Sequence, residues 1–219
     1  MPMTQPGTQP GTQTGRSLPP AYFDALYARD PDPWRFATSE YEHQKYDRSL
    51  AATGEQAIGR AWEVGCSIGV FTRRLAARCG SVLAVDVAES ALREAAARCA
   101  DLANVSFLRQ QIPQDWPDGC FDLIVFSEVL YYLAPDEVLA VARRSAASLN
   151  PTGRIVLVHW TGATDYPCSG DQAATLFCAA AAPGLAVRLT ERHKHYRIDV
   201  LTAQRALGDA AARDQPGKV

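Results

Sequence analysis

The sequence has little that would direct it to an oxidising compartment or into a membrane. Its six cysteines include no C-x-x-C pair, and most lie in apolar runs, where a free thiol packs as a small hydrophobe. No basic segment followed by an apolar one opens the chain, and its most apolar late stretch, residues 173–187, is interrupted by Pro183 and Gly184. We therefore expect reduced cysteines, a cytoplasmic location and no membrane span.

An excess of charge of one sign is also missing. The 219 residues carry 22 Lys and Arg against 24 Asp and Glu, which gives a formal net charge of −2. Such a chain offers no broad positive field to a phosphate backbone, so we expect no nucleic-acid partner and favour a small molecule. Because 47% of the residues are hydrophobic, the chain can bury one sizeable core, and one globular domain is expected.

The composition divides the chain into four segments. Residues 1–18 are repeats of Pro, Gly, Thr and Gln with little to bury, and we expect a disordered tail. Residues 19–57 carry two helical patterns, the second opened by Ser39 and Glu42 as a capping box, and predict N-terminal lid helices over the domain. Residues 58–206 predict the main domain, and residues 207–219 a flexible tail.

Strand and helix patterns alternate in the main domain and predict an α/β fold. Apolar runs typical of strands end at Glu63, Asp86, Arg109, Ser127 and Trp160. The helix after the first run should close at Gly80 with a positive φ. The β-α-β order implies parallel strands with right-handed crossovers, hence an open, doubly wound sheet. Two late strands, residues 185–192 and 196–203, are so close in sequence that they must be antiparallel neighbours.

The stretch from Gly65 to Gly69 is a tight turn between a strand and a helix. Glycines let a ligand approach the backbone and the helix offers free N–H groups, so such a turn is typical of a site for a nucleotide-like ligand. Asp86 ends the next strand, 21 residues after Gly65, and adjacent parallel strands place its carboxylate beside the turn. That carboxylate could accept hydrogen bonds from both hydroxyls of a ribose, or it could only cap the following helix.

The turn has two other interpretations. The dinucleotide fingerprint G-x-G-x-x-G does not fit, because Ser67 replaces the second glycine and Gly69 comes one residue early. The nucleophile elbow G-x-S-x-G does fit, with Ser67 as nucleophile and His193 or His195 as its partner, but that elbow normally follows several strands. The two histidines also have a spacing that permits metal binding, yet no third ligand is identifiable and we expect no metal.

Four segments together resemble the successive motifs of class I S-adenosylmethionine-dependent methyltransferases. They are residues 63–69, 82–86, 121–125 and 149–157. The resemblance implies a Rossmann-like, seven-stranded sheet, mostly parallel with an antiparallel last strand, and S-adenosyl-L-methionine as the cofactor.

By this resemblance the cofactor lies along the turn and the neighbouring strand ends. Asp86 holds the ribose, Val87 packs on adenine, and the backbone N–H of Ile112 serves adenine. Gln111 stands where many relatives have an Asp that accepts from the adenine amine, and its amide oxygen can accept the same bond without the charge. The expected cofactor-binding residues are Trp34, Lys45, Glu63, Gly65, Cys66, Ser67, Gly69, Asp86, Val87, Gln111, Ile112 and Ser127.

Segments outside these motifs resemble the nodulation protein S family. They are Asp32-Pro33-Trp34-Arg35, Tyr41-Glu42 with Lys45, and Ser127-Glu128 followed by Tyr131-Tyr132-Leu133. The resemblance implies an N-methyltransferase that acts on the free amino sugar at the non-reducing end of a chitooligosaccharide. An O-methyltransferase of a sugar or secondary metabolite, and a protein that binds the cofactor without catalysis, are the alternatives.

The candidate catalytic residues follow from the need to align an amine and remove its proton. Trp34 could close over the sulfonium or only pack in the core, and Lys45 could meet the cofactor's carboxylate or lie on a solvated helix face. A sugar amine is largely protonated near neutral pH, and Glu128 and His159, at the ends of the fourth and fifth strands, are the candidate bases. Tyr131 could offer a flat face to the sugar ring.

Overall fold

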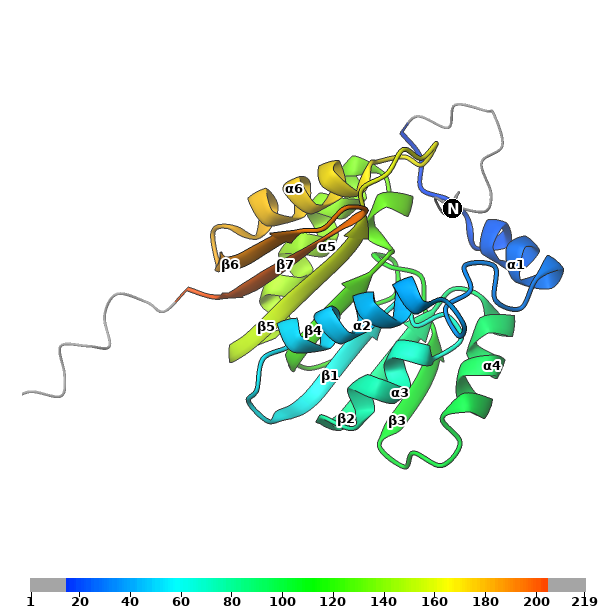
Figure 1. The fold of residues 1–219 in the computed structure, drawn as a ribbon. Helices are drawn as coiled ribbons and strands as arrows, with labels where there is room; N and C mark the ends of the chain where they lie inside the picture. The colour runs from blue at the N-terminus through cyan, green and yellow to red at the C-terminus, as the bar shows by residue number, and fades with distance from the viewer. Residues whose placement is uncertain (1–14, 205–219) are drawn as a thin grey trace, which may run out of the picture.

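The computed structural model describes residues 15–204, which form one mixed sheet with helices on both faces (Figure 1). The strands are β1 (Ile58–Val64), β2 (Cys79–Asp86), β3 (Val105–Arg109), β4 (Phe121–Ser127), β5 (Leu149–Trp160), β6 (Leu185–Arg192) and β7 (Tyr196–Ala203). The helices are α1 (Pro20–Arg29), α2 (Glu40–Ala52), α3 (Val70–Ala76), α4 (Glu89–Arg98), α5 (Pro135–Ala147) and α6 (Gly170–Ala181), with a short 3-10 helix η1 (Leu130–Tyr132).

The sheet has seven strands in the order β3-β2-β1-β4-β5-β7-β6. β1 pairs in parallel with β2 on one side and β4 on the other, and β5 continues the parallel part beside β4. β7 lies between β5 and β6 and is antiparallel to both. The predicted Rossmann-like sheet with an antiparallel last strand is confirmed.

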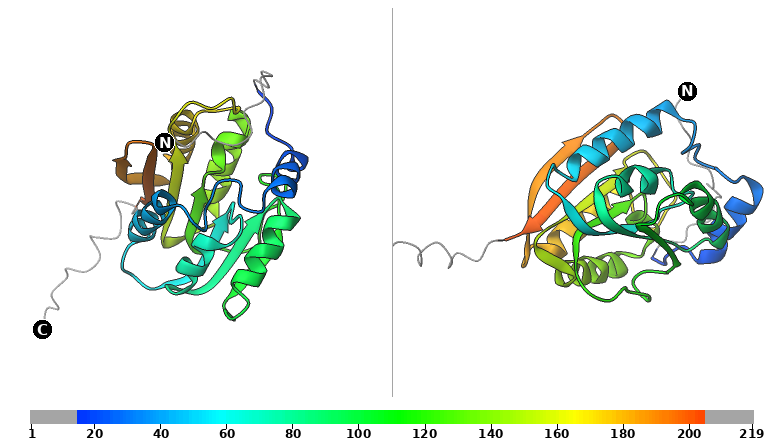
Figure 2. Two further views of the ribbon diagram at one scale, coloured as in Figure 1. Left: turned by 45° about the vertical axis from the view of Figure 1, so that its right-hand side comes forward. Right: turned by 90° about the horizontal axis from the view of Figure 1, so that it is seen from below.

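Alternate side chains of the central strands face two separate cores. Trp62, Ile124 and Leu157 belong to the core that includes residues of α5 and α6, whereas Ala61 and Val125 belong to the core that includes residues of α2 and α3. Figure 2 shows the helices on the two faces of the sheet from two further directions. Burial on both faces explains why these strands are almost continuously apolar in the sequence.

Two expectations about element boundaries were wrong. α3 ends at Ala76, and Gly80 lies inside β2 without a positive φ. A Cβ at Gly80 would lie 2.8 Å from the backbone oxygen of Gly59 on β1, so the close approach of two strands, rather than a helix cap, requires this glycine. The fifth strand, which the apolar pattern predicts from Arg154, begins at Leu149.

The expected tails lie almost entirely outside the described residues. Ser17 and Leu18, which we expected in the first tail, instead contact the body of the protein. The N–H of Leu18 donates to the carbonyl of Tyr132 at 2.9 Å, and the Ser17 hydroxyl accepts from the N–H of Ala134 at 2.7 Å. Residues 17 and 18 are therefore packed near the start of α5 and do not belong to a free tail.

The six cysteines are free thiols, and four of them are buried. The expectation of unpaired, mostly buried cysteines is met. Within residues 15–204, no helix has both the length and the apolar character that a membrane crossing requires.

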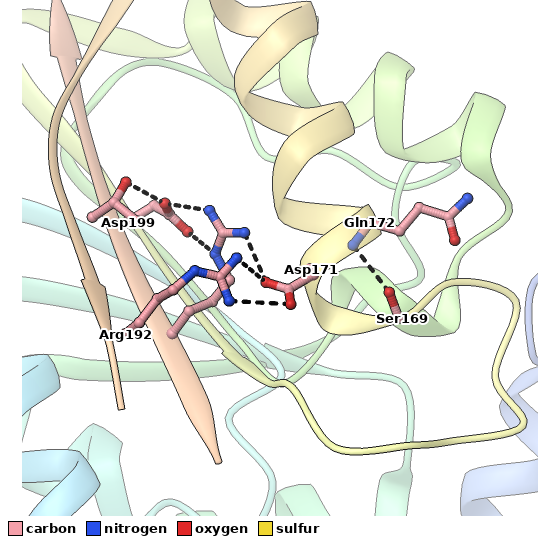
Figure 3. A network of polar contacts seen from close by, with 7 residues as sticks. Ser169, Asp171, Gln172, Arg192 and Asp199 are labelled. Carbon is pink, nitrogen blue, oxygen red and sulfur yellow. Dashed lines mark hydrogen bonds and ion pairs between the residues drawn. The ribbon is translucent and has the colours of Figure 1, made fainter. Parts of the chain in front are cut away.

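A buried ion pair joins β7 to its neighbours (Figure 3). Arg197 donates through Nε and Nη2 to the two carboxylate oxygens of Asp199 at 2.8 and 2.7 Å, and these side chains are only 9% and 1% exposed. The Thr190 hydroxyl of β6 donates to the same carboxylate at 2.7 Å, while Arg197 Nη1 reaches Asp171 of α6 at 2.9 Å. The network thus fixes α6 and β6 relative to β7.

Replacing Asp199 by Ala should destabilise the protein by about 3 kcal/mol, because the buried guanidinium of Arg197 would keep only Asp171 as a partner. Asp101→Ala is the matched control, since the Arg73–Asp101 pair is 44% and 63% exposed and should contribute little. Urea unfolding of both variants and the parent measures the difference. Equal losses in the two variants would contradict this account of the network.

Candidate functional site

An open cavity lies at the carboxyl ends of β1, β2 and β4, with a volume of about 1180 Å³ that includes the solvent at its mouth. Val64, Asp86 and Ser127, the last residues of these strands, all line it. Tyr27 of α1 and Lys45 of α2 complete part of the wall, so the two helices that precede the sheet take part in the site (Figure 1). This is the edge at which open α/β sheets bind their ligands.

Backbone hydrogen bonds hold the turn after β1 against β2. The N–H groups of Gly65 and Cys66 both donate to the carbonyl of Val85, at 2.9 and 3.0 Å. Gly65 has a φ of 81°, and a Cβ there would lie 2.1 Å from Cγ2 of Val129, so only glycine fits. The glycine therefore lets the residues that follow β4 approach the turn.

The carboxylate of Asp86 is bonded to the turn and to the start of α4. Its Oδ2 accepts from the N–H of Ser67 at 2.9 Å, and its Oδ1 accepts from the N–H of Ala88 at 3.0 Å. Burial raises the pKa of Asp86, although these N–H groups oppose the shift. A carboxylate has about four lone-pair positions, so Asp86 can accept bonds from a ligand in the cavity beside these backbone bonds.

The structure brings most of the predicted site residues to one cavity. Those that line it are Trp34, Lys45, Glu63, Gly65, Cys66, Ser67, Asp86, Val87, Gln111, Ile112, Ser127, Glu128 and Tyr131.

Gly69 and His159 are not among the residues that line this cavity. Gly69 has a φ of 75°, and a Cβ there would lie 2.9 Å from Cα of Ala95, so this glycine allows α3 and α4 to pack closely. Gly69 thus has a packing role, and its contact with the cofactor stays a prediction.

His159 lies in the core behind the cavity wall. Its side chain is fully buried, and Nε2 accepts from the N–H of Leu130 at 3.3 Å. Burial lowers the pKa of His159 to about 4, so the imidazole is neutral near pH 7. Since the ring packs 5.6 Å from that of Tyr131, between centroids, and does not reach the cavity, its position argues against the predicted role as general base.

Glu128 is bonded through both carboxylate oxygens. Oε1 accepts from Lys45 at 2.7 Å, and Oε2 accepts from the Tyr131 hydroxyl at 2.6 Å and from the N–H of Trp160 at 2.8 Å. Burial alone would raise the pKa of Glu128, but Lys45 and Tyr131 hold it below its ordinary value. An ionised carboxylate with these partners is a weak proton acceptor, which disfavours Glu128 as the base.

Lys45 is buried between two carboxylates. Its side chain is 3% exposed, and Nζ lies 2.7 Å from both Glu42 and Glu128. The interpretation of Lys45 as part of a solvated helix face is therefore wrong. Because the chain's own carboxylates already surround this ammonium, a further bond to a cofactor carboxylate is disfavoured.

Trp34 packs in the core and also borders the cavity. Its side chain is 7% exposed and stacks on Phe36 with ring centroids 5.6 Å apart, as a core residue would, yet it also lines the cavity. An indole in this position can contribute to a flat, apolar wall.

Sequence analysis missed several cavity residues, of which Tyr27 and Glu42 are the most informative. Tyr27 pairs its hydroxyl with that of Ser67 at 2.5 Å, which leaves the nucleophile-elbow interpretation without a histidine partner for Ser67. Glu42 was interpreted as part of a capping box, and its N–H does donate to Ser39 at 3.4 Å, but its side chain pairs with Lys45. The Glu-x-x-Lys spacing was the signal that could have revealed this contact.

The cavity wall is rich in acidic groups. Within residues 15–204 the lining includes four carboxyl groups, of Glu42, Glu63, Asp86 and Glu128, and one basic side chain, Lys45. Oε2 of Glu63 and Oε1 of Gln110 are buried and have no hydrogen-bond partner in this part of the chain. The site therefore fits a cationic ligand with hydrogen-bond donors, as S-adenosyl-L-methionine is.

The two late histidines stack on aromatic side chains. His193 lies on Tyr196 with ring centroids 4.2 Å apart, and His195 lies on Trp160 at 5.2 Å. Among the described residues, no group of three or more His, Cys, Asp and Glu side chains is arranged to hold a metal ion.

Residues 24–160 match the family model described as Nodulation protein S (NodS). The chain belongs to the nodulation protein S family. One curated relative is Nodulation protein S of Sinorhizobium fredii. It is 32% identical over 127 residues, which are 57% of this chain and 59% of that protein. Nodulation protein S of Bradyrhizobium diazoefficiens is 35% identical over 119 residues, 54% and 57% of the two chains. The chain thus spans less than two thirds of the length of each relative.

A solved structure in the same family has the same fold. The N-methyltransferase NodS from Bradyrhizobium japonicum, in complex with S-adenosyl-L-homocysteine, superposes with a TM-score of 0.74 at 23% identity, over 84% of this chain and 97% of that one. The predicted resemblance to the nodulation protein S family is confirmed, and at this identity the structural likeness shows the fold.

Glu63 should make the cofactor-free protein less stable as the pH rises. Burial, with the Asp86 carboxylate adding to it, raises the pKa of Glu63 in the folded chain from 4.5 to about 7. The stabilisation of the protonated form is complete below about pH 4.5 and is lost as the pH rises through about 7, by roughly 3 kcal/mol. Glu63→Gln is uncharged at every pH and should lose this dependence. Urea unfolding of both proteins between about pH 5 and 8 provides the comparison. A constant stability difference across that range would contradict the assignment.

Proposed function

We propose that this chain is an S-adenosyl-L-methionine-dependent methyltransferase that N-methylates an amino sugar or a similar small amine. The observation that carries the proposal is the contact at 2.9 Å between the N–H of Ser67 and Asp86. It joins the turn after β1 to the carboxylate that ends β2, on the wall of one cavity. Family membership supports the same activity, since a NodS protein from another organism is named as an N-methyltransferase.

The cofactor would lie along the ends of β1, β2 and β3. Asp86 would accept from the ribose hydroxyls with its remaining lone pairs, and Val87 and Ile112 would flank adenine. Gln111 would accept from the adenine amine, and the neighbouring Gln110, whose buried Oε1 has no partner within residues 15–204, is a second candidate for that bond. Bound here, the cofactor would supply an electrophilic methyl group on a positively charged sulfur.

The charge of the cavity favours an amine over a hydroxyl acceptor. Near neutral pH a sugar amine arrives largely as an ammonium ion. The lining has four carboxyl groups, of which Glu63, with a pKa of about 7, is partly protonated, against one lysine, and this excess attracts such an ion. A neutral hydroxyl has no such electrostatic attraction to the cavity, so the O-methyltransferase alternative has less support. The aromatic side chains of Tyr131, Tyr132 and Trp160 line the same cavity and would offer flat faces to a sugar ring, in keeping with a chitooligosaccharide acceptor.

Positioning would provide most of the rate. Direct transfer needs no covalent bond to the enzyme, and alignment of two bound groups can lower a barrier by roughly 7 to 11 kcal/mol. The residues that surround the site are suited to this task, because Tyr131 is buried and Lys45 joins α2 to Glu128 through an ion pair at 2.7 Å.

Replacing Asp86 by Ala should weaken S-adenosyl-L-methionine binding about tenfold or more, because two charge-assisted hydrogen bonds to the ribose are lost. Calorimetric titration with the cofactor measures the affinity. Asp101→Ala is the control, since this exposed carboxylate pairs with Arg73 and is not among the residues that line the cavity. Unchanged affinity of Asp86→Ala would remove Asp86 from the ribose site.

The mass of the acceptor after incubation tests turnover. A glucosamine oligosaccharide with a free amine should gain the mass of one methyl group, and its fully N-acetylated counterpart should gain none. If the chain binds the cofactor but no amine or sugar gains mass, the alternative of a cofactor-binding protein without catalysis is supported instead.

A further inference from the structure

We infer that the carboxylate of Glu42, on α2, binds the protonated amine of the acceptor and takes its proton. The inference rests on the proposed function and gives Glu42 the role for which the sequence suggested Glu128 or His159. It follows from the different surroundings of two carboxylates on the same cavity wall.

Glu42 has acceptor capacity that Glu128 lacks. Within residues 15–204, the one ion-pair partner of the Glu42 carboxylate is Lys45, whose Nζ lies 2.7 Å from Oε2, and Oε1 forms no ion pair there. Glu128 accepts bonds from Lys45, Tyr131 and the backbone of Trp160. Glu42 is 3% exposed and lines the cavity, and Lys45 is bound to its Oε2, so Oε1 is the oxygen that remains for a ligand.

The local charge calls for a second cation. Glu42 and Glu128 carry two negative charges, and Lys45 balances one of them. A buried charge without a partner is costly, so an ammonium ion from the acceptor would complete the cluster. The same cavity contains the turn at Gly65, which places such an ammonium in one space with the cofactor.

The surroundings of Glu42 also make it the better proton acceptor. Burial raises the pKa of Glu42, Lys45 from its own helix opposes the shift, and Glu128 after β4 and Asp32 before α2 add to it. The pKa of Glu128 is lowered instead. Geometry and basicity therefore select the same carboxylate.

The proton step balances without a further reactant. One N–H bond of the ammonium breaks, its proton moves to a carboxylate oxygen of Glu42, and the electron pair stays on nitrogen as the lone pair that accepts the methyl group. The methylated product is again a cation, and the proton on Glu42 passes to water when the site opens. Glu128 and Lys45 act as positioning residues, because they hold Glu42 rather than touch the amine.

A binding experiment tests the inference without turnover. The full chain, loaded with S-adenosyl-L-homocysteine, is titrated with a glucosamine oligosaccharide that has a free terminal amine and with its N-acetylated counterpart. The parent should prefer the amine, and Glu42→Gln should reduce that preference at least about tenfold. Glu40→Gln is the matched control, because Glu40 is exposed on the same helix and its carboxylate accepts from Gln44 at 3.1 Å. A parent without the preference, or a Glu42→Gln protein that keeps it, would overturn the inference.

Turnover and cofactor binding separate this inference from the proposed function. Glu42→Gln should lower kcat about a hundredfold or more and weaken S-adenosyl-L-methionine binding far less than Asp86→Ala does. Glu42→Asp keeps the charge and should restore part of the amine preference even if the Gln variant folds poorly. A Glu42→Gln protein with parental kcat would refute the role of Glu42 alone. A parent that binds no cofactor would instead refute the proposed function.

Discussion

The parallel pairing of β1 between β2 and β4 is the constraint on which the site depends. Three strands that run the same way end at the same edge, so the residues that follow them meet there although they are far apart in the sequence. The turn at Gly65, the carboxylate of Asp86 and the segment after Ser127 form one wall for this reason. Gly65 permits the closest of these approaches, since any side chain would collide with Val129.

A second constraint comes from the buried ammonium of Lys45. Its two ion pairs, each at 2.7 Å, join α2 to the residue that follows β4, and so place the N-terminal helices against the sheet. Removing two carboxylates and a lysine from water costs free energy. A hydrophobic contact of the same size would hold α2 in place without that desolvation penalty. We connect this polar cluster with the cation that the site is proposed to bind.

The strain at Glu128 belongs to the same arrangement. This residue has a φ of 57°, which residues other than glycine seldom adopt. Its N–H donates to the carbonyl of Val158 at 2.8 Å. The conformation turns the carboxylate toward Lys45, Tyr131 and the backbone of Trp160. A strained backbone at Glu128 thus accompanies a hydrogen-bond network that joins the end of β4 to α2 and β5.

The sequence by itself determined the alternation of strands and helices, the turn at Gly65 and the identity of the family, because these depend on local patterns and on motifs a few residues long. Only the tertiary structure decided what each polar side chain contacts. Gly80 and Gly65 look alike in the sequence, yet one meets a neighbouring strand and the other a residue far along the chain. Glu42, Glu128 and His159 likewise differ through burial and partners supplied by other elements. Burial and pairing arise when distant segments pack together, and no local pattern contains that information.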